Sequence, residues 1–314
     1  MYNWKRVKEH RVVYLILQGR IGNQLFMYAF AKAVQEELGK DTKIIIDESK
    51  VLDAKWVNSL RDYDLKNVEF VSDRGAINEH LNILQKICLR LYEKKYMYST
   101  EYQEKFAAEK KWQGLLNRIG MIICENGYIK HKIYSNRKNI VLLGFFQSER
   151  YFSKVADIIK SELNLEEKLK GSGYPALEDL QERNSVCISI KVEHNVGSAM
   201  YDVCTKEYWE KAVQYVTERV KNPLFFICSD NVEYVLNNII DCNEYEVVVQ
   251  DSRYPVSISL AAMAQCKHFI IGNTTYGWWA QYLSKNEDKI VIAPSKWMLV
   301  DMPIDIYQDN WITM

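Results

Sequence analysis

The chain has 314 residues, 48% of them hydrophobic and 26% charged, and its 41 Lys and Arg residues equal its 41 Asp and Glu residues. This length exceeds the size at which a single hydrophobic core usually keeps growing, so two domains are expected. The balanced charge argues against nucleic acid or a membrane surface as the main partner, and the composition excludes a disordered or fibrous chain.

The cysteine pattern and the hydropathy indicate in which compartment the protein is expected. Seven cysteines are present without a C-x-x-C pair, which disfavours a zinc site and a disulfide framework. No run approaches the roughly 18 apolar residues that a membrane span needs, and residues 1–10 lack an apolar leader. We expect a cytoplasmic protein that does not cross a membrane, with peripheral contact at the inner face of the membrane left open.

The N-terminal part predicts a βαβ unit. Residues 12–17 form an apolar run that is typical of a buried parallel strand. A loop with two glycines follows at 19–24, then a helix to about residue 34 and a second strand at 43–47. Short connections of this kind are characteristic of an α/β fold.

Residues 81–140 have a helical, aromatic and basic pattern. Twelve Lys or Arg residues stand against five Asp or Glu, a local net charge of +7. Such a surface could hold an acceptor sugar or an anionic lipid-linked glycan, or it could be a solvated helical face with core aromatics. Both interpretations stay open at this point.

Strands and helices alternate after residue 140. Strands are predicted near 140–147, 186–190, 224–228, 245–249, 268–272 and 289–293, and helices near 151–160, 206–221, 231–239, 256–266 and 276–284. This alternation predicts mostly parallel, doubly wound sheets. We therefore expect two Rossmann-like domains, one over residues 1–150 with a helical insertion at about 81–135, and one over residues 151–314.

Ligands of open parallel sheets bind beyond the carboxyl ends of the strands, and three such loops carry suitable chemistry. The loop after the strand near 268–272 contains Asn273, Thr274 and Thr275, which could receive a phosphate at the start of a helix. Thr275 would equally serve as the N-cap of that helix without any ligand. Ser229 and Asp230 could accept hydrogen bonds from a ribose or a base, although an N-cap explains Asp230 nearly as well.

The third loop contains Arg20, Gly22 and Asn23, which offer close backbone approach and donors for an anion or a sugar hydroxyl. Its G-x-x-G spacing differs from the G-x-G-x-x-G pattern of dinucleotide-binding enzymes, and no P-loop is present. A Rossmann oxidoreductase is therefore a poor interpretation.

At these places the chain resembles glycosyltransferase family 11, the α-1,2-fucosyltransferases. Residues 19–29 read GRIGNQLFMYA and residues 144–152 read GFFQSERYF, both close to family motifs. Similar matches occur at residues 226–231 (FICSDN), 273–283 (NTTYGWWAQYL) and 289–297 (KIVIAPSKW). The motifs occur in the family's order across about residues 11–300.

The resemblance implies a GT-B architecture, in which two Rossmann-like domains face each other across a cleft. It implies an inverting enzyme without a metal or other cofactor that transfers L-fucose from GDP-fucose to a galactoside hydroxyl. The implied partners are a nucleotide-sugar donor, held by the C-terminal domain, and a glycan or lipid-linked oligosaccharide acceptor in surface polysaccharide synthesis, with no nucleic acid. Protein donors would then meet the charge on the departing diphosphate.

The chain departs from the family at one motif, which the family has as His-x-Arg-Arg-x-Asp. Residues 189–195 read SIKVEHN, so Lys191 replaces the arginine that grips the diphosphate, and Val192 and His194 stand at the second Arg and the Asp. A lysine binds phosphate as a point charge without the planar bidentate contact. The chain could be an active fucosyltransferase, use another nucleotide-sugar donor, or be a non-catalytic binding protein.

The candidate catalytic residues are accordingly Lys191, Asn23 and His194. His194 could act as general base towards the acceptor hydroxyl because its ordinary pKa is near neutrality, or it could simply lie in a surface loop.

Overall fold

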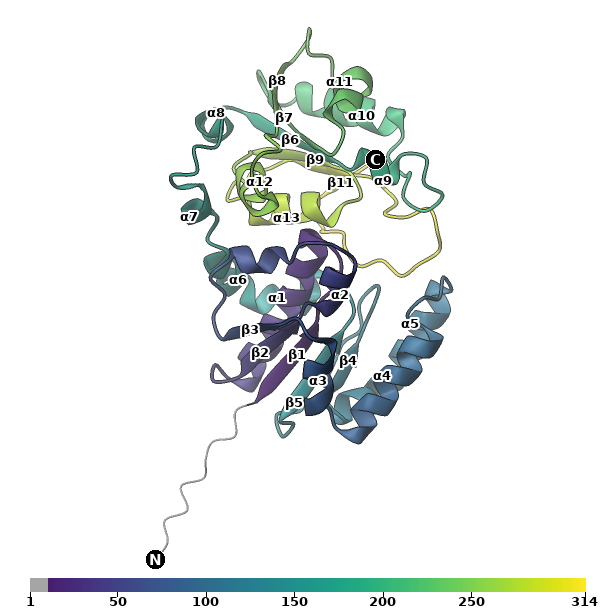
Figure 1. Ribbon diagram of the computed structural model, residues 1–314. Coiled ribbons are helices and arrows are strands. Elements are labelled where there is room, and N and C mark those ends of the chain that lie inside the picture. The colour runs from purple at the N-terminus through teal and green to yellow at the C-terminus, as the bar shows by residue number, and fades with distance from the viewer. Residues whose placement is uncertain (1–10) are drawn as a thin grey trace, which may run out of the picture. The chain divides into compact units, whose positions relative to one another are not determined.

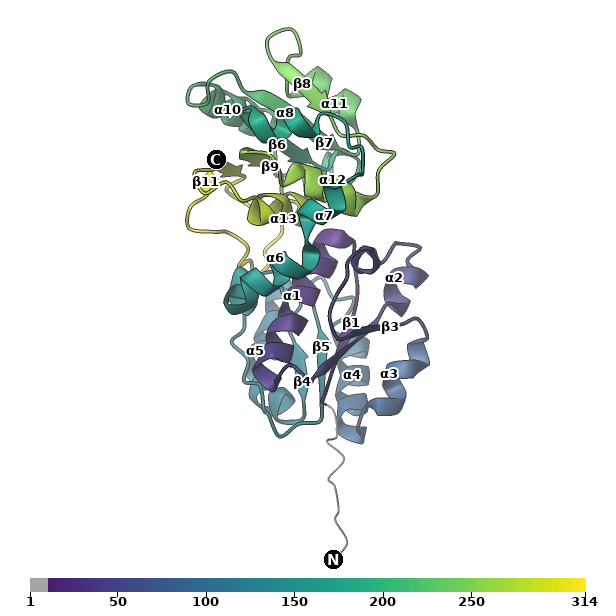
Figure 2. The same cartoon turned by 90° about the vertical axis from the view of Figure 1, so that its left-hand side faces the viewer.

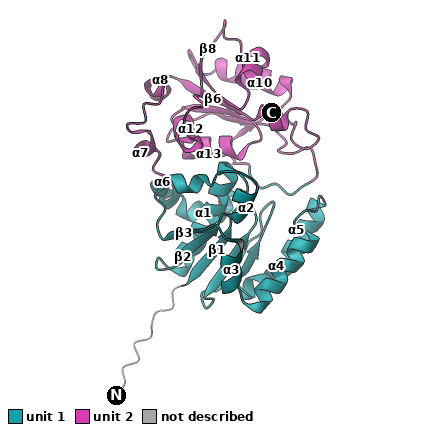
Figure 3. Ribbon diagram, viewed as in Figure 1, with its two compact units in different colours: residues 1–162, 302–306 teal, residues 163–301, 307–314 magenta. Residues whose placement is uncertain are grey.

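The structure is a computed structural model that describes residues 11–314. The expectation of a missing leader concerns residues 1–10 and lies outside this range. The chain forms two compact units: the first extends to Glu162 and includes Met302–Ile306, and the second comprises Leu163–Asp301 and Tyr307–Met314 (Figure 3). None of the helices within residues 11–314 is long and apolar enough to span a bilayer.

A parallel five-stranded sheet forms the centre of the first unit (Figure 1). Its strands, in the order β3-β2-β1-β5-β4, are β1 (Val12–Ile16), β2 (Lys43–Asp47), β3 (Val68–Val71), β4 (Met121–Ile123) and β5 (Asn139–Leu143). Its main helices are α1 (Ile21–Leu38), α2 (Ser49–Asp53), α3 (Arg74–His80), α4 (Ile83–Lys95) and α5 (Tyr102–Arg118), and α6 (Ala156–Leu163) ends at the boundary.

Both faces of this sheet are covered, which is why β1 and β5 are apolar almost throughout. Helix α1 lies on one face and is buried on nearly all sides, in agreement with its many Ala, Leu and Phe residues. Ile77 of α3 and Leu89 and Tyr92 of α4 pack on the other face against Tyr14 and Val141. Figure 2 shows α1 and the pair α3 and α4 on opposite sides of the strands.

The helical pattern predicted over residues 81–140 is only partly correct. Helices α4 and α5 occur there, but the edge strand β4 follows directly, and residues 124–138 form a loop without helix. A three-residue strand is too short for periodicity to reveal, and pairing with β5 determines its conformation.

The second unit is built on a parallel six-stranded sheet in the order β11-β10-β9-β6-β7-β8. The strands are β6 (Ser185–Ile190), β7 (Leu224–Ser229), β8 (Glu246–Val249), β9 (His268–Ile271), β10 (Val291–Ala293) and β11 (Ile312–Thr313). The helices are α7 (Leu165–Leu169), α8 (Leu177–Glu182), α9 (Val192–Asn195), α10 (Lys206–Thr217), α11 (Val232–Asn238), α12 (Val256–Met263) and α13 (Thr275–Leu283).

The core of the second unit follows from the same two-sided burial. Trp209 and Val213 of α10 and Val235 of α11 pack on one face of the sheet, against Ile188 and Ile227. Figure 1 shows α12 and α13 on the opposite face. The predicted α/β fold with two mostly parallel, Rossmann-like sheets is confirmed.

Gly144, directly after β5, offers a test of the close approach between two backbone segments in the first unit. Its φ is +137°, and a Cβ there would collide with the carbonyl oxygen of Cys124. We expect Gly144→Ala to lower the free energy of unfolding by at least about 2 kcal/mol, because strain and overlap add. Urea denaturation measures the change.

Gly114 provides the matched control. It lies inside α5, and a Cβ there would meet nothing within 4 Å. Gly114→Ala should raise the free energy of unfolding by about 0.5–1 kcal/mol, since alanine is the better helix former. A neutral Gly144→Ala would contradict the close approach of the two backbones.

Candidate active site

The strand order of the second unit reverses between β6 and β9. From β6 the chain continues to β7 and β8 on one side, and β9, β10 and β11 lie on the other. Loops diverge at such a point, which makes the carboxyl ends of these two strands the expected place for a ligand. Lys191 follows β6 there, and Gly272–Thr275 follow β9.

Asn273 connects the loops around this point. Its buried side-chain Nδ2 donates to the carbonyl oxygens of Tyr201 and Trp297, both at 3.0 Å, and its Oδ1 accepts from Asn195 Nδ2 at 2.9 Å. A neutral amide suits this position because one side chain supplies two N–H donors and an acceptor oxygen. Asn273 therefore positions three segments that surround the carboxyl edge of the sheet.

A small pocket opens beside Asn273. Its lining includes Ile190, Lys191, Asn195, Tyr201, Cys204 and Gly272. Burial raises the pKa of the Cys204 thiol to about 12, so this side chain is a neutral wall of the pocket. Lys191, half-buried, supplies a cationic group on the lining.

Asp230 holds the start of α9. Its Oδ1 accepts the backbone N–H of Val192 at 2.6 Å and that of Glu193 at 3.4 Å. The following helix α11 is capped by Asn231, whose side chain accepts from Tyr234, so the N-cap interpretation of Asp230 is wrong for α11. Asp230 instead accepts hydrogen bonds from the short helix α9, which follows Lys191 at the end of the neighbouring strand β6.

The other residues predicted in this unit lie nearby on the chain. Thr274, with its side chain accepting from Gly277 N at 3.1 Å, is the N-cap of α13, and Thr275 is the first helical residue. The prediction of Thr275 as cap is therefore wrong by one position, because Thr274 has the extended backbone that a cap needs. Ser229 ends β7 and accepts from Asn231 N at 3.0 Å.

His194 lies on the exposed side of α9, and its ring contacts that of Tyr201 with 4.8 Å between centroids. This placement is compatible with both interpretations of the histidine, as a base or as a surface residue.

The sheet of the first unit has an equivalent point between β1 and β5. The loops after these strands are joined there, since Gln147 Nε2 donates to Asn23 Oδ1 at 2.9 Å. Gly22 is buried in the first turn of α1, and the exposed Arg20 places its guanidinium 5.9 Å from the centre of the Trp56 ring. The structure thus brings together Asn23 and Gln147, which lie far apart in the sequence.

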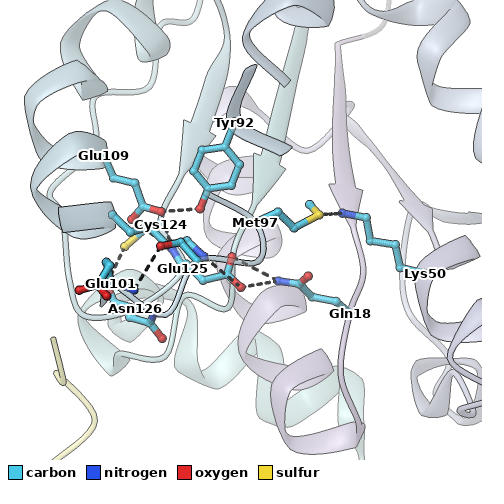
Figure 4. Close-up of polar contacts among 11 residues, drawn as sticks. Gln18, Lys50, Tyr92, Met97, Glu101, Glu109, Cys124, Glu125 and Asn126 are labelled. Carbon is cyan, nitrogen blue, oxygen red and sulfur yellow. Dashed lines mark hydrogen bonds and ion pairs between the residues drawn. The ribbon is translucent and has the colours of Figure 1, made fainter. Parts of the chain in front are cut away.

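Sequence reasoning missed a polar cluster at the same edge of this sheet (Figure 4). Gln18 follows β1 and donates to the Glu125 carboxylate at 3.4–3.5 Å, and Glu125 follows β4. Tyr92 Oη donates to Glu109 at 2.6 Å, and Lys105 Nζ lies 4.0 Å from Glu125. The available signal was the position of Gln18 directly after a predicted strand; nothing in the pattern revealed Glu109.

Burial dominates the electrostatics of this cluster. It raises the pKa of Glu109 to about 7, an effect that the hydrogen bond from Tyr92 only partly offsets. Burial likewise raises the pKa of Glu125, opposed by the charge of Lys105. Two carboxyl groups close together cannot both ionise freely in such surroundings.

Within residues 11–314, no three His, Cys, Asp or Glu side chains lie together as a group that could hold a metal ion.

Comparison with known proteins identifies the family. The family model described as "Glycosyl transferase family 11" matches residues 12–314. The chain belongs to glycosyltransferase family 11. This family 11 enzyme is a glycosyltransferase, as the resemblance of its motifs predicted.

Two of its relatives are glycosyltransferases of Escherichia coli. It is 25% identical to the O-antigen biosynthesis glycosyltransferase WbnK of Escherichia coli, over 96% of this chain and 100% of the relative. It is 24% identical to an Escherichia coli alpha-1,2-colitosyltransferase, over 91% of this chain and 92% of the relative.

Among solved structures, the fucosyltransferase NodZ from Bradyrhizobium matches with a TM-score of 0.53 at 12% identity, over 87% of this chain and 92% of NodZ. This likeness shows a GT-B fold. The predicted family and fold are therefore confirmed, and the roles of individual residues in this glycosyltransferase stay predictions.

Asn273 yields a stability prediction for the glycosyltransferase. Asn273→Ala leaves Asn195 and two carbonyl groups without this partner, so the free energy of unfolding should fall by about 2–4 kcal/mol. Hydrogen exchange should accelerate in residues 196–204 and 294–301. Asn238→Ala, in an exposed helical position, is the control and should change neither quantity appreciably. Unchanged exchange in Asn273→Ala would refute the positioning role.

Glu109 yields a pH prediction. Its pKa is raised to about 7 in the folded chain against 4.5 ordinarily, so the folded state binds the extra proton between these values. The free energy of unfolding should therefore be larger near pH 5 and fall as pH rises through 7, by on the order of 1–3 kcal/mol from this group.

The measurement compares denaturant unfolding of wild type and variants from pH 5 to pH 8. Glu109→Gln should remove this component of the slope, whereas Glu104→Gln, exposed on the same helix, should retain it. Parallel curves for wild type and Glu109→Gln would show that Glu109 is already ionised throughout this range.

Proposed function

We propose that this glycosyltransferase transfers L-fucose from GDP-fucose to a galactoside hydroxyl of a glycan or lipid-linked oligosaccharide, with inversion at the anomeric carbon and without a metal or other cofactor. The main support for a donor site in the second unit is that Lys191 and the Asn273 loop line one pocket, at the point between β6 and β9 where the strand order reverses. Relatives named galactoside alpha-(1,2)-fucosyltransferase, such as the Bos taurus enzyme, support the sugar, and NodZ co-crystallised with GDP supports the nucleotide.

The first requirement of the reaction is stabilisation of the departing diphosphate. The acceptor oxygen forms its bond to the anomeric carbon as the bond to the diphosphate breaks, and negative charge accumulates on GDP. In the proposal, the Lys191 ammonium and the first amides of α13, beside Thr274 and Thr275, receive this charge. For Arg20 and Gly22, which lie in the first unit, a donor-binding role stays a prediction from the motif resemblance.

Asp230 limits which helix start can bind the diphosphate. Its carboxylate already occupies the first amides of α9, so a diphosphate at that helix start would meet a negative charge. We assign the anion to α13 instead. Asp230 and Ser229 then serve the ribose or the base, as carboxylate and hydroxyl acceptors at the end of β7.

The second requirement is removal of the proton from the acceptor hydroxyl. His194 is exposed on α9, three residues after Lys191, and is the proposed base. Asn23, oriented by Gln147, is proposed to orient a reacting sugar by hydrogen bonding.

The test of this function measures GDP released from GDP-fucose in the presence of galactoside acceptors. Lys191→Ala should lower kcat/KM by about 100-fold to 1,000-fold, because it removes a charge that acts on the leaving group. Lys191→Arg should retain most activity, since arginine is also a phosphate-binding cation. Lys170→Ala, an exposed lysine of the second unit, is the control and should match wild type.

Measurable GDP binding without turnover of any donor would replace the proposal by a non-catalytic binding role. Equal turnover by wild type and Lys191→Ala would remove Lys191 from the site while leaving the transferase function intact.

A different donor sugar is the second candidate function. Two points favour it: the motif resemblance implies an arginine at the position that Lys191 occupies, and the colitosyltransferase aligns over 91% of this chain. Competition between GDP-fucose and GDP-colitose decides the matter. A higher kcat/KM for GDP-colitose would make this candidate the function.

A further inference from the structure

Helix α4 exposes an apolar stripe to solvent. Ile83, Leu84, Ile87 and Leu91 are exposed to 76%, 57%, 49% and 63% respectively. Ile83, Ile87 and Leu91 follow one another at intervals of four residues, and Leu84 lies seven before Leu91, so all four share one face of the helix.

The opposite face of α4 is the one that packs on the unit. Leu89 and Tyr92 are buried in the core of the first unit, and Gln85 Nε2 donates to the carbonyl oxygens of Ile119 and Gly120 at 3.1 and 3.2 Å. A capping box of Asn82 and Gln85 fixes the start of the helix. Contacts of the buried face thus fix the orientation of α4, and the apolar stripe on the opposite face points outward.

The charges beside the stripe have one sign. Lys86 and Arg90 lie along one border, Lys95 lies along the other, and Lys94 lies near the C-terminal end. The acidic residue of this helix, Glu93, is 3.7 Å from Lys50 and is thereby compensated. An apolar stripe bordered by cations is the pattern of helices that lie in the interface of an anionic membrane.

We propose that the outward face of α4, consisting of Ile83, Leu84, Ile87 and Leu91 with Arg90 and Lys94, docks this protein on an anionic phospholipid surface. The apolar side chains enter the boundary between headgroups and acyl chains, and the cations contact lipid phosphates. Tyr98, 90% exposed just after the helix, adds an aromatic side chain of the kind that favours this interface.

A second copy of the chain fits this face less well. A symmetric dimer places the same patch against itself, so the positive charges of Arg90 and Lys94 would be present on both sides of the interface. Like charges facing each other across an interface are unfavourable, whereas lipid phosphates complement them. The inference needs no assumption about the donor or the reaction, and its failure would leave the proposed function untouched.

The experiment is flotation of the full-length protein with vesicles. Wild type should bind vesicles of phosphatidylethanolamine with phosphatidylglycerol, bind pure phosphatidylcholine far less, and lose binding as salt is raised. Ile87→Glu with Leu91→Glu should reduce the partition coefficient by about tenfold or more, and Arg90→Glu with Lys94→Glu should do the same. Circular dichroism and urea unfolding confirm that these surface variants fold.

Matched controls lie elsewhere on the chain. Leu52→Glu changes another exposed leucine, on α2, and Lys206→Glu changes an exposed cation on α10; both should bind vesicles as wild type does. Binding that is unaffected by either α4 double variant would overturn the proposal. Failure of the wild type to bind vesicles would also overturn it. A third contrary outcome is a wild-type protein that binds no vesicles but sediments as a dimer, and that the double variant Ile87→Glu with Leu91→Glu converts to monomers.

Discussion

The candidate site depends on one constraint of parallel sheets: where the strand order reverses, the loops after two neighbouring strands diverge and leave their carboxyl ends accessible. The second unit reverses between β6 and β9, and the first has its equivalent between β1 and β5. Family motifs occupy all four of these loops or their immediate continuation, including Lys191 and Asn273 in one unit and Asn23 and Gln147 in the other. The predicted site residues therefore gather at the carboxyl ends of the strands, where the topology is expected to make room for a ligand.

Electrostatics then distinguishes between the helix starts near the second reversal. Asp230 neutralises the positive end of α9 through two amides, and that carboxylate would repel a diphosphate. Helix α13 begins with the hydroxyl of Thr274 as its cap and has no acidic residue in its first turn. In the proposed function, this asymmetry would allow Lys191, a point charge rather than a planar guanidinium, to suffice: the amides of α13 would supply the directed hydrogen bonds that the lysine lacks.

Much of this was predictable from sequence, and the failures have physical causes. Strands β6 and β7 are predicted because each is an apolar run that is buried on both faces of the sheet. The cap of α13 is predicted one residue late because adjacent threonines are equivalent until backbone dihedral angles separate them. Only the alternative interpretation of Asp230, as the cap of α11, is wrong: its partner, the Val192 amide, is 38 residues away and is brought near by the pairing of β6 with β7. The two-residue strand β11 and the Glu109 cluster depend on tertiary contacts in the same way.

The region between residues 81 and 140 divides its aromatic and basic side chains between the core and the surface. Tyr92 is a core aromatic, as the interpretation of a solvated helical face with core aromatics predicts, whereas Lys105 is a cation buried beside Glu125. Arg90 and Lys94 lie instead on the exposed face of α4 with Ile87 and Leu91. A face that served only solubility would be expected to lack its apolar residues, because exposed leucine and isoleucine promote association. Their arrangement in one stripe, bordered by a single sign of charge, is therefore better explained by a surface that this helix contacts.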